Sequence, residues 1–359
     1  MSQMHLIPLA ALERAIRLVV AGFGSTPDEV ESVAGNLIDA NLTGHDSHGI
    51  GMLPRYAEAF LEGGLTPNSH VRTVLDAGAL LRLDGGAGFG QVIGKEAMAL
   101  GIERARRHGT AIVAIGNSHH LGRIGAWAEQ VAAAGFVSLH FVNVMAEPIV
   151  APHGGLRPAF GTNPFTAGVP LAGREPLILD FATSMIAYGK ARVAYNKGQQ
   201  VPEGSVIDAQ GRPTTDPGAI VNDPHGAILA FGAHNGYGVA VLCELLGGAL
   251  AAGMVGHRED GSRKRILNGM LSVIVDPTAL GGGEAFEREA RAFVDSLLDV
   301  PPRPGFDRVL IAGDPERAQR ARRSAQGVPV DATTWQQIVD AALRLGVDPR
   351  SVQQAARLA

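Results

Sequence analysis

Residues 45–56 read His-Asp-Ser-His-Gly-Ile-Gly-Met-Leu-Pro-Arg-Tyr and lie between two stretches with helical periodicity. Gly49, Gly51 and Pro54 predict a sharp change of chain direction inside this stretch. Two histidines, an aspartate, a serine, an arginine and a tyrosine so close together are typical of a binding or catalytic site. We therefore expect the chain to be organised around this turn.

Helices are predicted on both sides of the turn. Residues 11–22 and 26–42 precede it, and the second helix opens with a capping box in which Thr26 is the N-cap and Glu29 reaches back. Apolar residues recur at helical spacing between Val30 and Ile38. A third, short helix is expected at 54–61.

From about residue 71 the pattern changes to short β-rich runs that alternate with helical segments. Strands are predicted at 80–83, 111–115, 136–142, 177–181 and 270–275, and helices at 91–108, 122–134, 184–196, 236–252 and 284–298. Connections as short as these favour one compact α/β domain.

The proline-rich segment at 301–304 marks a boundary, after which one strand and then helices near 315–325, 333–345 and 348–358 are expected. These terminal helices have no partner nearby in sequence, so we expect them to pack against the N-terminal helices. The predicted organisation is a helical domain of residues 1–75 plus 305–359, with an α/β domain of residues 76–304 inserted into it.

Composition narrows the class of protein. A formal net charge of −4 and the absence of a run of Lys or Arg argue against nucleic acid or a membrane surface as a partner. The single cysteine, Cys243, excludes an internal disulfide and suits a reducing compartment. The most apolar segment, residues 236–255, carries Glu244 and several glycines, which argues against a membrane span. A soluble cytoplasmic protein is expected.

A glycine cluster at 85–90 follows a predicted strand and precedes a helix. Its spacing, Gly86-x-Gly88-x-Gly90, is not the G-x-G-x-x-G of a dinucleotide fingerprint, and the next strand ends without an acidic residue for a ribose. The sequence therefore argues against an ordinary Rossmann site.

Polar residues stand at several other strand and helix ends. Arg123 follows His119-His120 where a strand meets a helix, and reads either as an anion-binding residue or as a surface arginine beside a cap. Asp180 closes a buried strand and reads as an N-cap or as a carboxylate that orients a histidine. Asn163 lies in a turn, and His234 either caps a helix or faces a cofactor.

Two other chemistries fit poorly. No histidine pair has His-x3-His spacing with an acidic third ligand, and His45-x2-His48 spans a turn, so no metal is expected. A serine hydrolase would require a G-x-S-x-G elbow, which the chain lacks, and neighbours such as Ser47 and His48 do not easily align as nucleophile and base.

Five ordered motifs resemble the malate/L-lactate dehydrogenase family of the non-Rossmann type: Asp46-Ser47-His48-Gly49 with Pro54 and Tyr56, Asn117-Ser118-His119-His120-x-Gly122, Gly161-Thr162-Asn163-Pro164, Asp180-x-Ala182-Thr183-Ser184 and Gly236-Tyr237-Gly238. The resemblance implies an α/β fold in which a mixed-sheet dinucleotide-binding domain is inserted between helical segments that form one helical domain. It also implies a homodimer that uses NAD or NADP.

The same resemblance implies roles for individual residues. His48 would lie near the nicotinamide as the acid/base, helped by Ser47 and Asp180, and His120 competes for that role. The substrate would be held by Arg55 or Arg123, with Tyr56 and Met52 beside it. The cofactor would be lined by His48, Gly122, Arg123, Ile124, Asn163, Ile178, Leu179, Asp180, Phe181, Ala182, His234, Gly313, Asp314, Pro315 and Glu316.

Two positions depart from the family pattern. Many relatives carry an arginine where this chain has Met52, so Arg55 or Arg123 would have to hold the substrate carboxylate. Relatives usually carry a lysine where this chain has Asn235, which leaves the choice between NAD and NADP open.

The expected activity is hydride transfer that interconverts 2-oxo acids and 2-hydroxycarboxylic acids, with an imidazolium at His48 whose pKa lies near the working pH. One alternative is an NADPH-dependent imine reductase that forms cyclic or N-methyl amino acids. The other is a dimer without catalytic activity.

Overall fold

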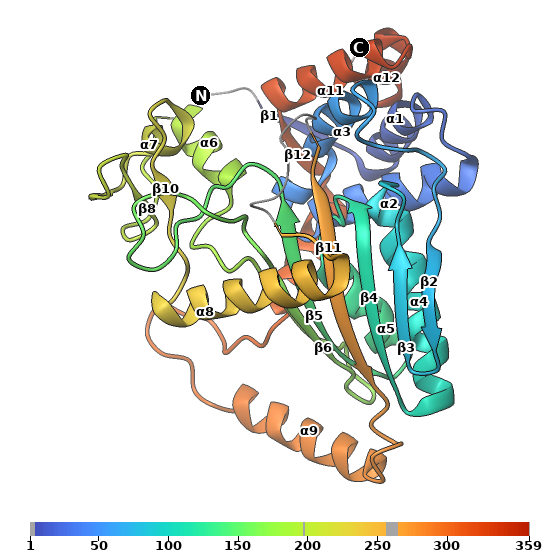
Figure 1. Cartoon of the computed structure of the whole chain (residues 1–359). Helices are drawn as coiled ribbons and strands as arrows, with labels where there is room; N and C mark the ends of the chain where they lie inside the picture. The colour runs from blue at the N-terminus through green and yellow to red at the C-terminus, as the bar shows by residue number, and fades with distance from the viewer. Residues whose placement is uncertain (1–3, 197, 256–264, 359) are drawn as a thin grey trace.

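The computed structural model of the chain describes residues 4–358, apart from residue 197 and residues 256–264 (Figure 1). Its α-helices are α1 (Leu9–Ala21), α2 (Pro27–Leu42), α3 (Leu53–Leu61), α4 (Gly90–His108), α5 (Gly125–Ala133), α6 (Tyr188–Asn196), α7 (Gly218–Val221), α8 (His234–Cys243), α9 (Gly283–Leu298), α10 (Asp314–Gln326), α11 (Ala332–Arg344) and α12 (Pro349–Ala355). The short 3-10 turns η1 (Asp46–His48) and η2 (Ile50–Met52) stand between α2 and α3, and a π-helix, η3 (Glu244–Ala252), continues α8.

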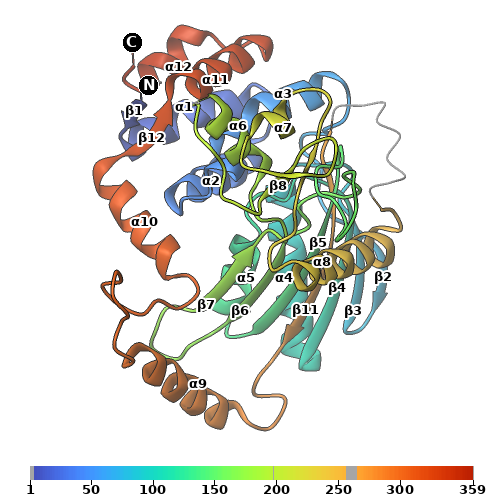
Figure 2. The same cartoon turned by 90° about the vertical axis from the view of Figure 1, so that its left-hand side faces the viewer.

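A seven-stranded mixed sheet has the order β2-β3-β4-β11-β5-β6-β7. Its strands are β2 (Arg72–Ala77), β3 (Leu80–Asp84), β4 (Thr110–His119), β5 (Val137–Met145), β6 (Phe165–Val169), β7 (Leu177–Phe181) and β11 (Leu267–Val275). Only β3 and β4 pair in parallel; the other neighbours are antiparallel. Helices α4 and α5 cover one face, and α8 with η3 crosses the other (Figures 1 and 2). The mixed order confirms that this domain is not of the Rossmann type.

A separate apolar core joins the two ends of the chain. Its members come from α1, α2 and α3 on one side and from α11 and α12 on the other, and they include Leu12, Leu37, Tyr56, Ile338 and Val352, all fully buried. The strand β1 (Met4–Ile7) pairs antiparallel with β12 (Val328–Asp331) beside this core. The predicted helical unit with an inserted α/β region is therefore present, while the boundaries after residues 75 and 304 stay predictions.

A third, smaller unit was not distinguished in the sequence. The short strands β8 (Val206–Ile207), β9 (Pro213–Thr214) and β10 (Ala227–Ile228) form a three-stranded sheet. They share a core with α6 and α7 that includes Val206, Ile220 and Ile228. In Figure 1 this unit lies to the left of the large sheet.

The apolar helix α8 and η3 approach the sheet closely because glycines face each other at the contact. A Cβ added to Gly247 would lie 2.5 Å from the carbonyl oxygen of Phe141, and one added to Gly269 would lie 2.1 Å from that of Gly247. Among the described residues, His234–Ala252 is the one helix long and apolar enough to cross a membrane. It packs on β4, β5 and β11, and 33% of it is buried there.

The sequence-based assignment differs from the structure in several connections. The strand expected between Pro304 and α10 is wrong: that segment is a turn-rich connection that reaches β7 through one bond, from Ile178 N to Ala312 O (3.3 Å). The helix expected from residue 122 begins at Gly125, and the one expected from 184 begins at Tyr188. Strands β1, β2, β6 and β12 were not predicted.

The capping box at α2 is half confirmed. Thr26 is the N-cap, and its hydroxyl oxygen accepts from Glu29 N (3.4 Å). The Glu29 carboxylate does not reach back, because it accepts hydrogen bonds from Asn68 N (2.9 and 3.0 Å) and Ser25 Oγ (2.7 Å). Asn68 Oδ1 takes the Thr26 N–H instead (2.7 Å). A tertiary contact has therefore replaced the local one.

A neutral histidine is enclosed in the sheet beneath α5. The ring of His140 is fully buried, with Nδ1 2.8 Å from Ser272 Oγ and Nε2 2.9 Å from Ser138 Oγ. Burial lowers the pKa of His140 to about 4, and the negative charge of Asp180 opposes this only in part. The two serines satisfy both ring nitrogens without requiring a second proton.

This histidine predicts a specific acid sensitivity. Its folded-state pKa of about 4 lies below the reference value of 6.5, so unfolding takes up a proton between these values. The stability that the neutral ring contributes is complete above pH 6.5 and is lost as the pH falls toward 4, about 3 kcal/mol in all. In urea titrations, His140→Gln should show a shallower fall in the free energy of unfolding than wild type. The exposed His108→Gln should keep the wild-type slope; equal slopes for all three proteins would contradict the prediction.

Candidate active site

The turn that carries His48 is held by a cluster of polar groups. Arg323 of α10 donates to both carboxylate oxygens of Asp46 (2.6 and 3.0 Å) and to the carbonyl oxygen of Asn41. The Asn41 side chain donates to Asp46 Oδ1 (2.6 Å) and accepts from Ile50 N (2.8 Å). A Cβ at Gly49 would lie 2.1 Å from Asn41 Oδ1, so only glycine fits there. One arginine and one asparagine thus fix both 3-10 turns.

His48 and His120 come together although 72 positions separate them in the sequence. Their rings stack with centroids 5.5 Å apart and an angle of 25° between the planes. His48 stands on η1, and its Nδ1 lies 3.0 Å from Ser47 Oγ. His120 follows directly after β4 and is 8% exposed. The structure therefore places both candidate acid/base residues at one point.

A buried hydrogen-bond chain leads away from His120. Tyr56 Oη lies 2.6 Å from His120 Nδ1, and Gln91 Nε2 donates to Tyr56 Oη at 2.9 Å. Tyr56 was predicted in the site, whereas Gln91 was missed. The only signal for Gln91 was its place directly after the glycine cluster at the start of α4. His119 packs edge-on against Tyr56 with centroids 5.3 Å apart.

Both stacked histidines favour the neutral form. Burial lowers the pKa of His48 to about 4, and the positive charges of His45, Arg123 and Lys190 act in the same direction, while Asp180 opposes them. The pKa of His120 lies well below its ordinary value, because the ring is buried and positive charge on His48 and His119 would repel a proton on it. The expectation that His48 has a pKa near neutral pH is therefore not met in this structure, because a charged ring would lose too much hydration.

Asp180 acts on His48 through its charge and not through a hydrogen bond. Its two carboxylate oxygens accept from Gly125 N at the start of α5 (2.8 Å) and from Thr166 Oγ1 (2.8 Å). A Cβ at Gly125 would lie 2.8 Å from Asp180 Oδ2, so the glycine makes this contact possible. The aspartate thus supplies the negative charge that the N-terminus of α5 favours.

The two candidate arginines have different surroundings. Arg123 is 2% exposed and donates to both oxygens of Glu129 (3.0 and 2.6 Å) and to Asp39 Oδ2 (2.9 Å). Arg55 lies on the exposed side of α3, and its charge contributes to the lowered pKa values of His119 and His120. Arg55 therefore presents its charge beside the histidine pair, whereas Arg123 is committed to two carboxylates.

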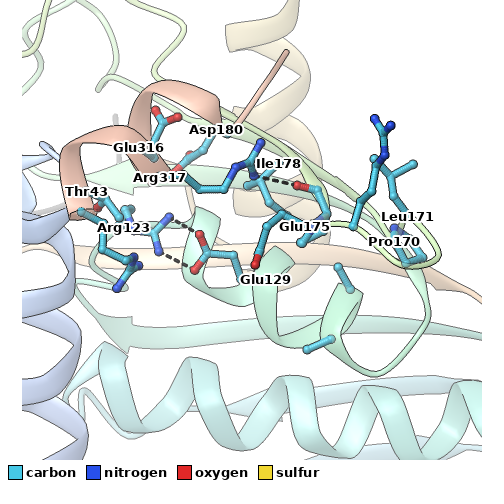
Figure 3. A pocket seen from close by; sticks show the side chains of 16 residues that line it. Thr43, Arg123, Glu129, Pro170, Leu171, Glu175, Ile178, Asp180, Glu316 and Arg317 are labelled. Carbon is cyan, nitrogen blue, oxygen red and sulfur yellow. Dashed lines mark hydrogen bonds and ion pairs between the residues drawn. The ribbon is translucent and has the colours of Figure 1, made fainter. Parts of the chain in front are cut away.

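A cavity of about 520 Å³ lies between α5, β7 and the start of α10 (Figure 3). Among its lining residues are five that were predicted to bind the cofactor: Arg123, Ile178, Asp180, Gly313 and Glu316. The volume falls within the range of small-molecule and cofactor sites.

The wall of this cavity is continuous with the turn that carries His48. Glu316 Oε1 lies 3.3 Å from His45 Nε2, and Arg320 pairs with Asp39. Burial alone would raise the pKa of Asp39. The hydrogen bond from Arg320 and the charge of Arg123 outweigh that effect and hold this pKa below its ordinary value.

Other predicted residues lie elsewhere. Strand alternation turns Leu179 and Phe181 to the opposite face of β7 from Ile178 and Asp180. The amide of Asn163 is used inside the fold, where it accepts from Val144 N (3.0 Å) and donates to Glu244 Oε2 (2.7 Å). His234 lies beside a second cavity, with its ring centroid 5.9 Å from that of His153.

The other candidates have contacts within the fold. Met52 is partly buried against the helical core, and Ile124 is buried in the sheet core. Gly122 has φ +73°, and a Cβ there would lie 2.6 Å from Asn36 Oδ1. Asp314, the first residue of α10, accepts from Ile311 N (3.1 Å) and Arg317 Nη2 (2.7 Å), and Pro315 follows it in the first turn. In the part of the chain that the structure describes, no group of three His, Cys, Asp or Glu residues is placed to hold a metal ion.

Known proteins resemble this chain over almost its full length. Hydroxycarboxylate dehydrogenase B of Escherichia coli K12 is 46% identical over 351 residues, which cover 97% of each chain. The L-lactate dehydrogenase of Cupriavidus necator is 40% identical over 343 residues, 95% of this chain and 98% of the relative. A Δ1-pyrroline-2-carboxylate/Δ1-piperideine-2-carboxylate reductase of Pseudomonas syringae pv. tomato is 35% identical over 320 residues, 88% of this chain and 90% of the relative.

The fold agrees with these sequence relationships. The solved sulfolactate dehydrogenase of Methanocaldococcus jannaschii superposes with a TM-score of 0.86 at 31% identity, covering 96% of this chain and 99% of the other. The family model for malate/L-lactate dehydrogenase matches residues 7–339. The chain belongs to the malate/L-lactate dehydrogenase family.

Proposed function

We propose that this protein is an NAD(P)-dependent oxidoreductase that interconverts 2-oxo acids and 2-hydroxycarboxylic acids by hydride transfer. The observation that carries the proposal is the stacked pair of His48 and His120 at 5.5 Å, close to the turn whose His45 contacts the wall of a cofactor-sized cavity. The relatives named as hydroxycarboxylate, lactate and sulfolactate dehydrogenases support the class of reaction.

The cavity suits a dinucleotide in its chemistry. Arg174 and Arg320 each pair with one carboxylate, but their side chains are 38% and 39% exposed and can still contact phosphates. Glu175 and Glu316 offer carboxylates for ribose hydroxyls. The bound nucleotide would supply or accept the hydride, and the protein aligns the acid with it.

We assign the proton donor to His120, which differs from the expectation that His48 fills this role. His120 Nδ1 already contacts the Tyr56 hydroxyl, so Nε2 remains for the substrate oxygen. His48 stacks on that ring and is more exposed, which suits a residue that packs against the nicotinamide. Both rings are neutral near pH 7, so the donor is an imidazole N–H and not an imidazolium.

Arg55 is the arginine that we assign to the substrate carboxylate. Arg123 is buried and bound to Glu129 and Asp39, so binding a substrate would require two ion pairs to break. Arg55 is exposed and close enough to His120 to influence its pKa. The guanidinium of Arg55 would then bind the substrate carboxylate in place of the arginine that many relatives carry at the position of Met52.

The activity itself is tested by a substrate panel. Oxaloacetate, 2-oxoglutarate, pyruvate and phenylpyruvate, each with NADH and NADPH, should show nucleotide oxidation with at least one combination. Pyruvate plus methylamine tests the imine-reductase alternative, which the pyrroline/piperideine carboxylate reductase relative favours. Turnover that requires the amine would replace the 2-oxo acid assignment with that alternative, and no turnover with any combination would contradict both.

Substitution of the two histidines separates their roles. His120→Ala should lower kcat for 2-oxo acid reduction by about 100-fold or more, because general acid catalysis is worth that much. The nucleotide Kd, measured by fluorescence titration, should change by less than about threefold. His48→Ala should weaken nucleotide binding more than it slows turnover. The opposite pattern would return the acid role to His48.

We further propose a homodimer that covers the open face of the sheet. An apolar row crosses six strands in register: Leu80, Ile112, Val273, Leu139, Ala167 and Leu179. Four of these residues are exposed large hydrophobics, and Leu250 of η3, the helix that packs on β4, β5 and β11, is 62% exposed. An apolar surface that runs across a whole sheet favours a protein partner. We place the dimer in the cytoplasm, where the buried thiol of Cys243 needs no disulfide.

A charge in the apolar row should separate the subunits. Leu139→Glu should convert a dimer into a folded monomer at micromolar concentration, because the carboxylate would lose its hydration in the interface. Light scattering after size exclusion measures the mass, and far-ultraviolet circular dichroism verifies the fold. Leu343→Glu, on the exposed side of α11, should remain a dimer. A monomeric wild type, or a dimeric Leu139→Glu protein, would exclude this interface.

A further inference from the structure

We infer that Gln91 is a positioning residue that sets the direction of the hydrogen-bond chain to His120, so that the proton of this imidazole is on Nε2. The inference rests on the proposed function, since it specifies how the acid is prepared. The chain consists of Gln91 Nε2 to Tyr56 Oη at 2.9 Å and Tyr56 Oη to His120 Nδ1 at 2.6 Å.

The direction follows from the number of protons that each group carries. An amide nitrogen only donates, so Tyr56 Oη must accept from Gln91. The tyrosine hydroxyl has one proton, which is then directed to His120 Nδ1. A neutral imidazole that accepts at Nδ1 carries its proton at Nε2. Gln91 thus makes His120 a donor on the side away from Tyr56.

Burial makes this direction persistent. Gln91 is 1% exposed, Tyr56 is fully buried and His120 is 8% exposed. Water therefore has little access with which to replace either bond or to supply a donor in the opposite sense. A surface chain of the same three residues would reverse freely.

The glycine cluster at 85–90 explains how Gln91 reaches this place. His119 N donates to Gly88 O (3.0 Å) and Ala87 N donates to Asn117 O (2.8 Å), so the glycine turn lies against the end of β4. A Cβ at Gly90 would lie only 2.2 Å from the carbonyl oxygen of His120. The glycines of this cluster therefore allow the start of α4 to pack against the histidines. This role does not require the spacing of a dinucleotide-binding motif.

The same chain can complete the proton transfer. The alkoxide formed at C2 takes the Nε2 proton of His120, and the Tyr56 hydroxyl proton moves to Nδ1. The phenolate oxygen then accepts the Gln91 N–H until a proton returns to it along the same chain through His120, which is its less buried end. Burial raises the pKa of Tyr56 and the bond from Gln91 opposes that effect, so the amide also stabilises the phenolate.

The test compares two substitutions that affect the chain differently. Gln91→Leu removes the bond and should lower kcat/KM for 2-oxo acid reduction by about fivefold. Gln91→Glu introduces an acceptor that reverses the chain, and should lower kcat/KM by about 100-fold at pH 8. Activity of Gln91→Glu should recover as the pH falls, because the buried carboxyl group, once protonated, donates to Tyr56 as the amide does.

Two controls isolate the hydrogen-bond direction. Gln130→Glu makes the same change at an amide that donates to the Lys95 carbonyl oxygen (3.0 Å), and should keep the wild-type pH profile. Nitrogen NMR of histidine-labelled protein should show His120 protonated at Nε2 in wild type and at Nδ1 in Gln91→Glu; its signal is the one lost in His120→Ala. Thermal melting verifies that each variant folds.

The outcomes are distinguishable. Protonation of His120 at Nδ1 in wild type, or parallel pH profiles for Gln91→Glu and Gln91→Leu, would overturn the inference. If Gln91→Glu does not fold, Tyr56→Phe should abolish the Nε2 preference while retaining the ring packing, and an unchanged preference would also overturn it. A wild type without activity on any 2-oxo acid contradicts the proposed function alone, because the NMR measurement still tests the tautomer.

Discussion

The contact between Arg323 and Asp46 is the constraint on which the arrangement of the site depends. Arg323 belongs to the C-terminal helix α10 and Asp46 to the turn that carries His48, so one guanidinium joins segments 277 positions apart. The same helix provides Glu316 and Arg320 to the cavity and contacts His45 and Asp39. The shape of the cavity and the position of His48 are therefore set together. The arginine is buried while Asp46 remains half exposed, so the pair keeps partial hydration and avoids the full cost of burying two charges.

Buried imidazoles recur in the molecule with different partners. His140 lies between two serines and has both nitrogens satisfied, which suits a structural role. His120 has Nδ1 bound to Tyr56, and the face of its ring stacks on His48. All of these rings favour the neutral form, since burial lowers their pKa values. An enzyme that protonates an oxygen with a neutral ring depends on which nitrogen carries the hydrogen, and therefore on the residues behind the ring.

The parts of this structure that were predictable have local signatures. Helix α2 has Thr26 and Pro27 at its start, and the mixed-sheet domain followed from family motifs that span the chain. The strands β1 and β12 were missed because each pairs with the other, more than 320 positions away. Gln91 was missed because a single glutamine in a helix forms no recognisable sequence motif. The surroundings of Arg123 depend on Asp39 from another helix, which no motif near Arg123 indicates. In β7 the family resemblance implied that residues 178–181 all line the cofactor. Because side chains alternate along a strand, these residues are divided between the two faces of the sheet.

The pairing of β1 with β12 has a consequence for the order in which the protein is assembled on the ribosome. The large sheet is complete once β11, ending at Val275, has been synthesised, and it has its own apolar core. The N-terminal helices appear first but must wait for α11, α12 and β12 to cover them. Because domains form as units during synthesis, the sheet can mature while the first helices are still incomplete. The turn bearing His48 can take its final shape only after Arg323 has been synthesised, so the reactive centre forms later than the sheet against which it works.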